Sequence, residues 1–180
     1  MARAGELGAD QALSFLREVD AINMRRRVRM VDLAREECGG SLAGRRVAVL
    51  GAAFKPHSDD VRDSPALSVA AQMQLQGASV VVTDPKAIAN AAKKWPDLQF
   101  ADTPNEAVEG AELVLVLTEW PEYVELDPAE TKRLVALPRV LDGRNCLDAE
   151  AWRAAGWTYR ALGRRDPTPQ AKHLRATRPR

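Results

Sequence analysis

The most constraining feature of this sequence is a short apolar stretch that runs directly into a charged loop. Residues 47–50 read Val-Ala-Val-Leu, which is typical of a strand buried in a parallel sheet. Gly51 permits a sharp turn at the end of this strand, and Pro65 suits the first turn of a following helix. The segment therefore predicts a strand, a loop and a helix, with the loop at the sheet edge where α/β folds bind ligands.

The loop between this strand and helix carries two cations, Lys55 and Arg62. At the carboxyl edge of a parallel sheet, beside the free N–H groups of the next helix start, cations favour a phosphate-bearing ligand. The second and third glycines of the dinucleotide fingerprint G-x-G-x-x-G are missing, so side chains would have to meet the phosphate. The alternative is that both cations pair with acidic residues of the same loop, which are Asp59, Asp60 and Asp63.

The rest of the chain alternates between apolar stretches and helix-forming stretches. Strands are expected at residues 45–50, 79–83, 98–100, 113–117, 139–141 and 157–161. Helices are expected at residues 65–76, 86–94, 103–109, 128–136 and 148–155. This alternation predicts an α/β fold with a doubly wound, mostly parallel, Rossmann-like sheet. Right-handed crossovers would bring the loops after the first, second, fourth and fifth strands to one edge.

Two of these loops offer polar side chains with open interpretations. Asp84 follows the second strand, where dinucleotide-binding folds often place an acid on a ribose hydroxyl, but an Asp-Pro step is also a common turn. Thr118, Glu119 and Trp120 follow the fourth strand and could face a base or a sugar. For Thr118 and Trp120 the alternative is a helix start and a packed aromatic ring.

Arg144 follows the fifth strand, after a glycine that allows the chain to turn back across the edge. Guanidinium groups bind phosphate in bidentate fashion, so Arg144 facing Lys55 would clamp a diphosphate between two loops. The alternative is an ion pair of Arg144 with Asp142 or Asp148.

A long helix is expected before the first strand, from Ala12 to about Cys38, because this stretch contains neither glycine nor proline. One apolar stripe comprises Ala12, Phe15, Leu16, Val19, Ile22, Met30, Leu33 and Ala34. A second comprises Leu13, Met24, Val28 and Val31. We expect the first stripe to cover the sheet and the second to meet a neighbouring subunit or another domain, with burial in one domain as the alternative. Asn23 lies in the first stripe and is expected to be a hydrogen-bonded core residue, with a ligand contact as the alternative.

Composition limits the classes of function. A chain of 180 residues suffices for one domain with an extra element but is too short for a two-domain dehydrogenase. The formal charge of +1 gives no reason to expect nucleic acid or a membrane as a partner. Cys38 and Cys146 have no metal-ligand spacing, and no signal peptide or long apolar span is evident, so we expect a cytoplasmic, disulfide-free protein. Residues 164–180 are expected to form a basic, disordered tail.

Taken together, these residues resemble the C-terminal part of the UDP-glucose 6-dehydrogenase family, within the wider UDP-glucose/GDP-mannose dehydrogenase group. The resemblance rests on four motifs in the order of the family: residues 51–56 continued through 60–65, then 84–85, 117–120 and 142–145. The third motif, Leu-Thr-Glu-Trp, is closer to the UDP-glucose branch than to the GDP-mannose or UDP-N-acetylmannosamine branches.

The resemblance implies different roles for two parts of the chain. Residues 1–40 would form the central helix that builds a homodimer, and residues 41–163 would form a Rossmann-like domain that binds the uridine diphosphate of a UDP-sugar. Phe54, Lys55 and Arg144 would be the substrate-binding residues. Arg62 would contact NAD, a cofactor held mainly by another Rossmann domain.

The family's enzymes oxidise the C6 alcohol of the sugar in two NAD-dependent steps through a cysteine thioester. This chain lacks the Gly-rich NAD domain and the Gly-Gly-x-Cys-x-Pro-Lys-Asp segment, and neither Cys38 nor Cys146 matches the nucleophile. We therefore predict no catalytic or metal-ligating residue here and no activity without an N-terminal half, truncated or encoded separately. The alternatives are a stand-alone nucleotide-sugar binding module, another nucleotide-sugar dehydrogenase acting on GDP-mannose or UDP-N-acetylmannosamine, and an unrelated NAD-binding Rossmann protein.

Overall fold

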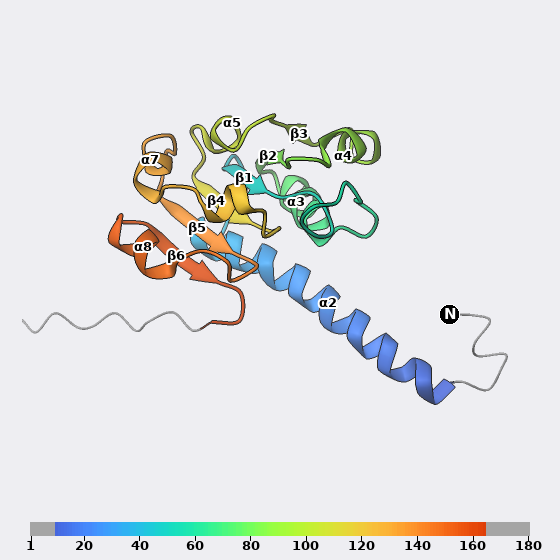
Figure 1. Cartoon of the computed structure of the whole chain (residues 1–180). Coiled ribbons are helices and arrows are strands. Elements are labelled where there is room, and N and C mark those ends of the chain that lie inside the picture. Colours follow the sequence, from blue (N-terminus) through green and yellow to red (C-terminus); the bar gives the residue numbers. More distant parts are fainter. Residues whose placement is uncertain (1–9, 165–180) are drawn as a thin grey trace, which may run out of the picture.

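The structure is a computed structural model that describes residues 10–164, with side chains from residue 14 onward. A six-stranded sheet forms its centre, in the order β3-β2-β1-β4-β5-β6 (Figure 1). The strands are β1 (Arg46–Leu50), β2 (Ser79–Thr83), β3 (Gln99–Phe100), β4 (Leu113–Val116), β5 (Arg139–Asp142) and β6 (Thr158–Ala161). All neighbouring strands run parallel, which confirms the predicted α/β fold with a doubly wound sheet. The tail expected at 164–180 lies, apart from residue 164, outside the described residues.

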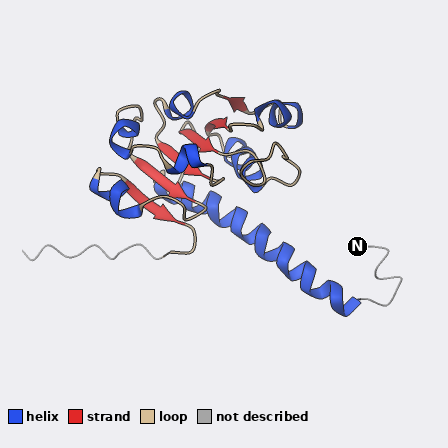
Figure 2. Cartoon of the chain, viewed as in Figure 1, coloured by secondary structure: helices blue, strands red, loops and turns tan. Residues whose placement is uncertain are grey.

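Helices connect the strands, as Figure 2 shows. They are α2 (Asp10–Glu37), α3 (Pro65–Leu75), α4 (Ile88–Lys94), α5 (Pro104–Val108), α6 (Pro121–Val124), α7 (Pro128–Lys132) and α8 (Ala149–Ala154). Several helix starts carry a local signal, because Ser64, Thr103 and Asp127 accept backbone N–H bonds and a proline follows each of them. The short helix α6 was not expected from the sequence.

The sheet order places the ligand crevice between β1 and β4, the point at which the strand order reverses. Gly51 lies at this point with a φ of 115°, and its N–H donates to the carbonyl of Thr83 over 2.8 Å. A Cβ at residue 51 would lie 2.5 Å from Thr118 Oγ1. Both its φ and this close approach therefore require glycine at residue 51, and the loop after β1 passes directly against the exit of β4.

The last third of α2 packs on the domain. Met30, Leu33 and Ala34 are buried in the core. Arg160 of β6 pairs with Glu37 at 2.9 Å, and Arg139 of β5 donates to the Glu37 carbonyl over 2.8 Å. These contacts hold the C-terminal end of α2 against β5 and β6.

The first part of α2 projects beyond the sheet, as Figure 1 shows. With 28 residues at about 1.5 Å each, the helix is roughly 42 Å long and extends past the domain. Phe15 is 70% exposed and Ile22 40%, so the expectation that the first stripe covers the sheet along its whole length is wrong. Val31 of the second stripe is buried in this same domain. Asn23 is exposed, which contradicts its expected place in the core.

Candidate functional site

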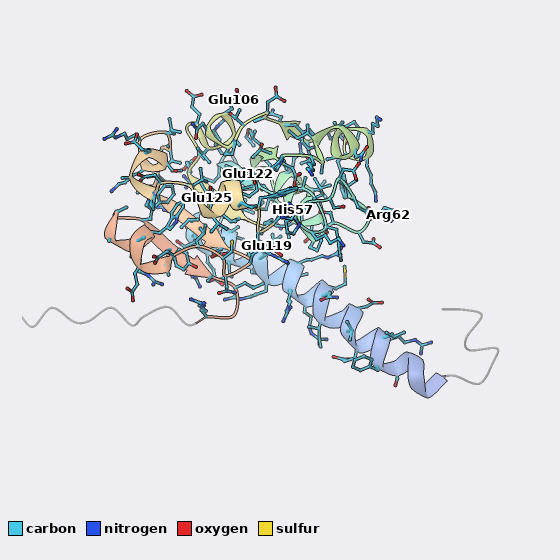
Figure 3. The ribbon with its side chains drawn as sticks, viewed as in Figure 1. His57, Arg62, Glu106, Glu119, Glu122 and Glu125 are labelled. Carbon is cyan, nitrogen blue, oxygen red and sulfur yellow. The ribbon has the colours of Figure 1, made fainter. Side chains whose placement is uncertain are left out.

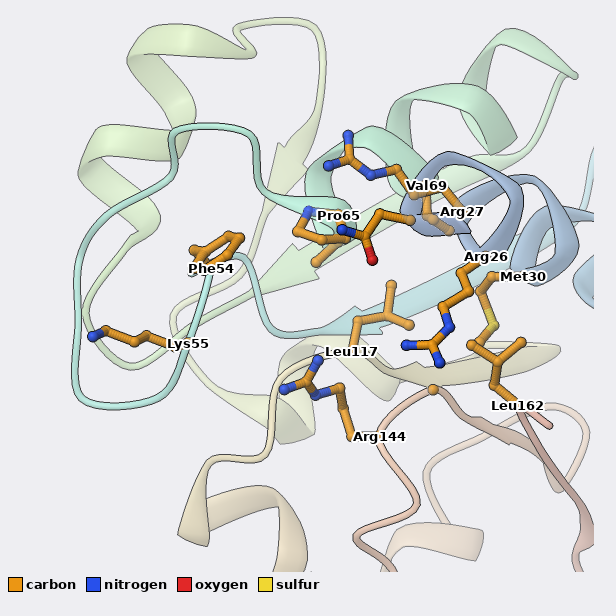
Figure 4. A pocket seen from close by; sticks show the side chains of 13 residues that line it. Arg26, Arg27, Met30, Phe54, Lys55, Pro65, Val69, Leu117, Arg144 and Leu162 are labelled. Atoms are coloured by element: carbon orange, nitrogen blue, oxygen red, sulfur yellow. The ribbon is translucent and has the colours of Figure 1, made fainter. Parts of the chain in front are cut away.

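A pocket of about 320 Å³ opens at the carboxyl edge of the sheet (Figure 4). Helix α2, the loop after β1, and the loop after β5 form its walls. Four of its lining residues are cations, namely Arg26, Arg27, Lys55 and Arg144, and none is acidic. Its apolar lining includes Met30, Phe54, Val69, Leu117 and Leu162. A cationic rim over an apolar floor suits a ligand that combines an anion with an apolar group.

The loop after β1 presents Phe54 and Lys55 at the mouth of this pocket. The loop is ordered by its own hydrogen bonds: Phe54 N–H donates to the Asp60 carbonyl over 2.8 Å, and Ser64 Oγ donates to the Ala52 carbonyl over 2.6 Å. Both Phe54 and Lys55 are exposed. In Figure 4 the Lys55 ammonium points outward, away from the guanidinium of Arg144. Because no carboxylate among the side chains described for residues 14–164 pairs with Lys55, the alternative of a loop ion pair does not hold for this residue.

Arg144 lines the opposite side of the pocket and is held by Glu119 of the loop after β4. Its Nη2 donates to Glu119 Oε1 over 2.8 Å, and its Nε donates to Oε2. The hydrogen bonds from Arg144 lower the pKa of Glu119, and those to Glu119 raise the pKa of Arg144. The alternative partners were wrong, since Arg144 donates only its backbone N–H to Asp142, and Asp148 caps α8.

Gly143 lets Arg144 reach this position. A Cβ at residue 143 would lie 2.8 Å from Leu117 Cδ2 and 3.0 Å from Met30 Cε, both of which line the pocket. The chain can therefore pass close to the floor of the pocket only where it has no side chain.

Arg62 lies outside the pocket, at the outer edge of the loop, and Figure 3 shows it apart from Glu119. Its Nη2 is 2.8 Å from Asp60 Oδ2, and its side chain is 86% exposed. The hydrogen bonds from Arg62 lower the pKa of Asp60 to about 2. The loop ion pair that was the alternative reading therefore exists for Arg62. Its expected contact with NAD stays a prediction.

Asp84 is a structural residue. Its Oδ2 accepts bonds from Ala52 N and Ala53 N, at 2.8 and 2.9 Å, and from Trp120 Nε1 at 3.1 Å. Its Oδ1 accepts bonds from the N–H groups of Lys86 and Ala87. With five donors and 2% exposure, the carboxylate has no free face for a ribose hydroxyl. We call this arrangement the Asp84 cluster.

Thr118 and Trp120 share this structural role. Thr118 Oγ1 donates to the Ala53 carbonyl over 3.0 Å, and Trp120 is 2% exposed. Neither side chain faces the pocket. The packing alternative holds for Trp120, whereas Thr118 does not start a helix, because α6 begins at Pro121 with Trp120 as its N-cap. Of the three polar residues after β4, only Glu119 acts at the pocket, through Arg144.

Asn23 of α2 lines the pocket, but the sequence did not single out the two cations that α2 contributes to it. Arg26 and Arg27 belong to the run Arg25-Arg26-Arg27, which is typical of a solvated helix face. They reach the site because α2 crosses the crevice, a tertiary feature that no local pattern reports. One signal was present: Arg26 lies four residues before the buried Met30 and so shares its helix face.

Neither cysteine has the character of a nucleophile. Burial raises the pKa of the Cys38 thiol, and burial together with Asp142 raises the pKa of Cys146 to about 12. Within residues 10–164 no group of three His, Cys, Asp or Glu side chains could hold a metal ion. No helix in the same part of the chain is long and apolar enough to cross a membrane.

Residues 48–149 match the family model described as "UDP-glucose/GDP-mannose dehydrogenase family, UDP binding domain". The chain is 36% identical over 157 residues to UDP-glucose 6-dehydrogenase TuaD of Bacillus subtilis, covering 87% of this chain and 34% of TuaD. It is 39% identical over 137 residues to UDP-glucose 6-dehydrogenase AglM of Haloferax volcanii, covering 74% of this chain and 29% of that one.

Solved structures agree with the match. A UDP-glucose dehydrogenase from Pyrobaculum islandicum superposes with a TM-score of 0.70 and 30% identity, over 90% of this chain and 34% of that chain. An NDP-N-acetyl-D-galactosaminuronic acid dehydrogenase from Methanosarcina mazei Go1 gives a TM-score of 0.66 and 29% identity, over 77% and 28%. The chain spans about a third of the length of these relatives.

Proposed function

This chain belongs to the UDP-glucose/GDP-mannose dehydrogenase family and matches its UDP-binding domain, and we propose that its pocket holds the uridine diphosphate of a UDP-sugar. The observation that carries the proposal is the set of four cations, with no acid, around one pocket at the switch point of the sheet. Arg144, already fixed by Glu119, retains free N–H groups for phosphate oxygens. Lys55 adds a second charge, and the exposed Phe54 offers an apolar surface to the nucleoside.

We further propose that the complete protein oxidises UDP-glucose to UDP-glucuronate in two NAD-dependent steps. The names of the curated relatives support UDP-glucose over other sugars. The crevice of this domain does not suit NAD itself, because the loop after β1 lacks the glycine fingerprint and Asp84 is fully bonded within the protein. NAD would then be held by another domain, with Arg62 at the exposed edge as a contact from this one.

Self-association through α2 is part of the same proposal. The projecting part of the helix exposes Phe15, Leu16, Val19 and Ile22 at helical spacing. An apolar stripe of this kind gains stability when it packs against the same stripe of a second copy. Sedimentation velocity over a wide range of concentrations tests this: a dimer that Ile22→Asp weakens is expected, and a strict monomer would contradict it.

The proposed ligand is tested by calorimetric titration of the 180-residue chain with UDP-glucose, GDP-mannose and NAD. We expect saturable binding of UDP-glucose that Arg144→Ala abolishes, and weaker or no binding of the other two. The exposed Arg133, whose one ion-pair partner among the described side chains is Glu130 of its own helix turn, gives a matched control in Arg133→Ala. Binding of NAD without any response to UDP-glucose would contradict the proposal and favour an unrelated dinucleotide-binding protein.

A further inference from the structure

Helix α2 places a second guanidinium opposite Arg144. Arg26 and Arg144 both line the pocket, and Figure 4 shows their guanidinium groups facing one another near Leu117. They come from segments more than a hundred residues apart, so local sequence does not explain their meeting. Arg26 has no hydrogen-bond or ion-pair partner among the side chains described for residues 14–164.

The direction of Arg26 is set by the packing of the helix. Met30, four residues later on the same face, is 3% exposed and also lines the pocket. The register that buries Met30 therefore turns Arg26 toward the crevice. Its neighbour Arg25 lies on another face, where it is 64% exposed and pairs with Glu18 at 2.7 Å.

Arg27, unlike Arg26, is hydrogen-bonded within the described part of the protein. Its Nη2 donates to the carbonyl of Asp63 over 3.0 Å, which ties α2 to the far end of the loop that carries Phe54 and Lys55. Asp63 holds a left-handed conformation with a φ of 51°, and this conformation presents its carbonyl to the helix. Arg27 thus positions the loop through its Nη2, whereas the whole guanidinium of Arg26 is left without a described partner.

We propose that Arg26 binds the substrate directly and forms, with Arg144, a two-sided clamp on the diphosphate. Two guanidinium groups that face each other repel unless an anion lies between them, and a diphosphate supplies negative oxygens to both sides. Glu119 pairs with Arg144 and not with Arg26, so the charge of Arg26 is left for the ligand. The proposal rests on the function proposed above and adds α2 to the binding site.

The test is calorimetric titration of the full chain with UDP, uridine monophosphate and uridine. For Arg26→Gln we expect an affinity for UDP lowered about tenfold, in line with one charge-assisted hydrogen bond. The loss should be smaller for the monophosphate and absent for uridine. Arg26→Lys should restore part of the affinity. The matched control is Arg25→Gln, which removes the same charge one residue away and should bind UDP as the wild type does.

Salt dependence separates a direct contact from a structural effect. If Arg26 meets a phosphate, the affinity of Arg26→Gln for UDP should fall less steeply with added salt than that of the wild type. Its melting temperature should stay unchanged, since the exposed side chain has no described partner.

Three results would overturn the inference. Unchanged UDP affinity in Arg26→Gln, together with loss in Arg144→Gln, would leave the proposed function standing and remove Arg26 from the site. Equal losses in Arg25→Gln and Arg26→Gln would show a general charge effect in place of a clamp. A wild-type chain that binds no uridine nucleotide would overturn the proposed function, and the role of Arg26 with it.

Discussion

The Asp84 cluster and the cationic pocket lie along the same edge of the sheet, yet their polar groups are used in opposite ways. In the Asp84 cluster one buried carboxylate accepts five N–H groups, and every donor has its partner. In the pocket, Lys55 and Arg26 have no carboxylate partner among the side chains described, and only Arg144 is paired. One region has satisfied its charges internally, whereas the other leaves them for something outside the chain.

The difference shows how to tell structural polar residues from ligand-binding ones at a sheet edge: the former have partners within the protein, and most of the latter do not. A buried polar group that loses its partner lowers the free energy of unfolding, so substitutions in the Asp84 cluster should mainly lower stability. Removing an exposed cation changes stability little, so substitutions in the pocket should mainly lower the affinity for the ligand. Substitutions in the two regions should therefore affect different measurements.

The largest effect is expected from Asp84→Ala. It leaves five N–H donors without their acceptor, four of them on the backbone of the loops after β1 and β2, and should lower the free energy of unfolding by about 4 kcal/mol. Urea unfolding measures the change. Asp60→Ala removes a partly exposed carboxylate from the loop after β1, where it pairs with the exposed Arg62, and should change the unfolding midpoint far less. Equal effects of the two would contradict the comparison.

Trp120→Phe should have a smaller effect on the same cluster. It keeps an aromatic ring in a buried site but removes the Nε1 donor that lies 3.1 Å from Asp84 Oδ2. The expected loss is about 1.5 kcal/mol in the free energy of unfolding, with unchanged affinity for UDP. A loss of UDP affinity without a loss of stability would place Trp120 in the binding site.

Glu119→Gln should act on binding more than on stability. The carboxylate fixes the Arg144 guanidinium, so its removal should lower UDP affinity about threefold, less than removal of Arg144 itself. The partly exposed ion pair should contribute below about 1 kcal/mol to stability. A rise in affinity would show that Glu119 competes with phosphate for Arg144.

The pH dependence of this ion pair follows from the lowered pKa of Glu119. Because Arg144 favours the charged form in the folded state, the stabilisation is complete above the ordinary value of 4.5 and is lost as pH falls through the lowered pKa. Between pH 6 and pH 8, urea unfolding should therefore give the same difference between wild type and Glu119→Gln.

The smallest effect on UDP binding is expected from Arg62→Ala. The side chain is 86% exposed and lies outside the pocket, so the UDP affinity and the unfolding midpoint should match those of the wild type. Under the function proposed above, the same substitution in the complete protein should raise the KM for NAD. A large loss of UDP affinity would move the site toward the outer edge of the loop.

The sequence predicted the sheet well because its signals are local. Buried strands such as β4 appear as unbroken apolar runs, and Pro65 marks the start of α3. The sequence could place Lys55 and Arg144 at one edge of the sheet because each follows the carboxyl end of a strand, and parallel strands end at one edge.

The rest depended on contacts between distant segments. The role of Asp84 depends on Trp120 and on the loop after β1, neither of which is near it in the sequence. Arg26 reaches the pocket only because α2 passes the crevice between its projecting N-terminal part and its packed C-terminal end. The 3.6-residue period of α2 gave the same pattern to the buried Met30 and the exposed Ile22, so the pattern could not report where the helix leaves the domain.

The most direct test of the central claim is a crystal structure of the chain with UDP. The account predicts the diphosphate in the pocket between α2 and the loops after β1 and β5, with oxygens within hydrogen-bond distance of Arg144 and Arg26. The Asp84 cluster should be unchanged. A diphosphate bound elsewhere on the sheet edge, for example against Thr83 and Tyr123, would contradict the account.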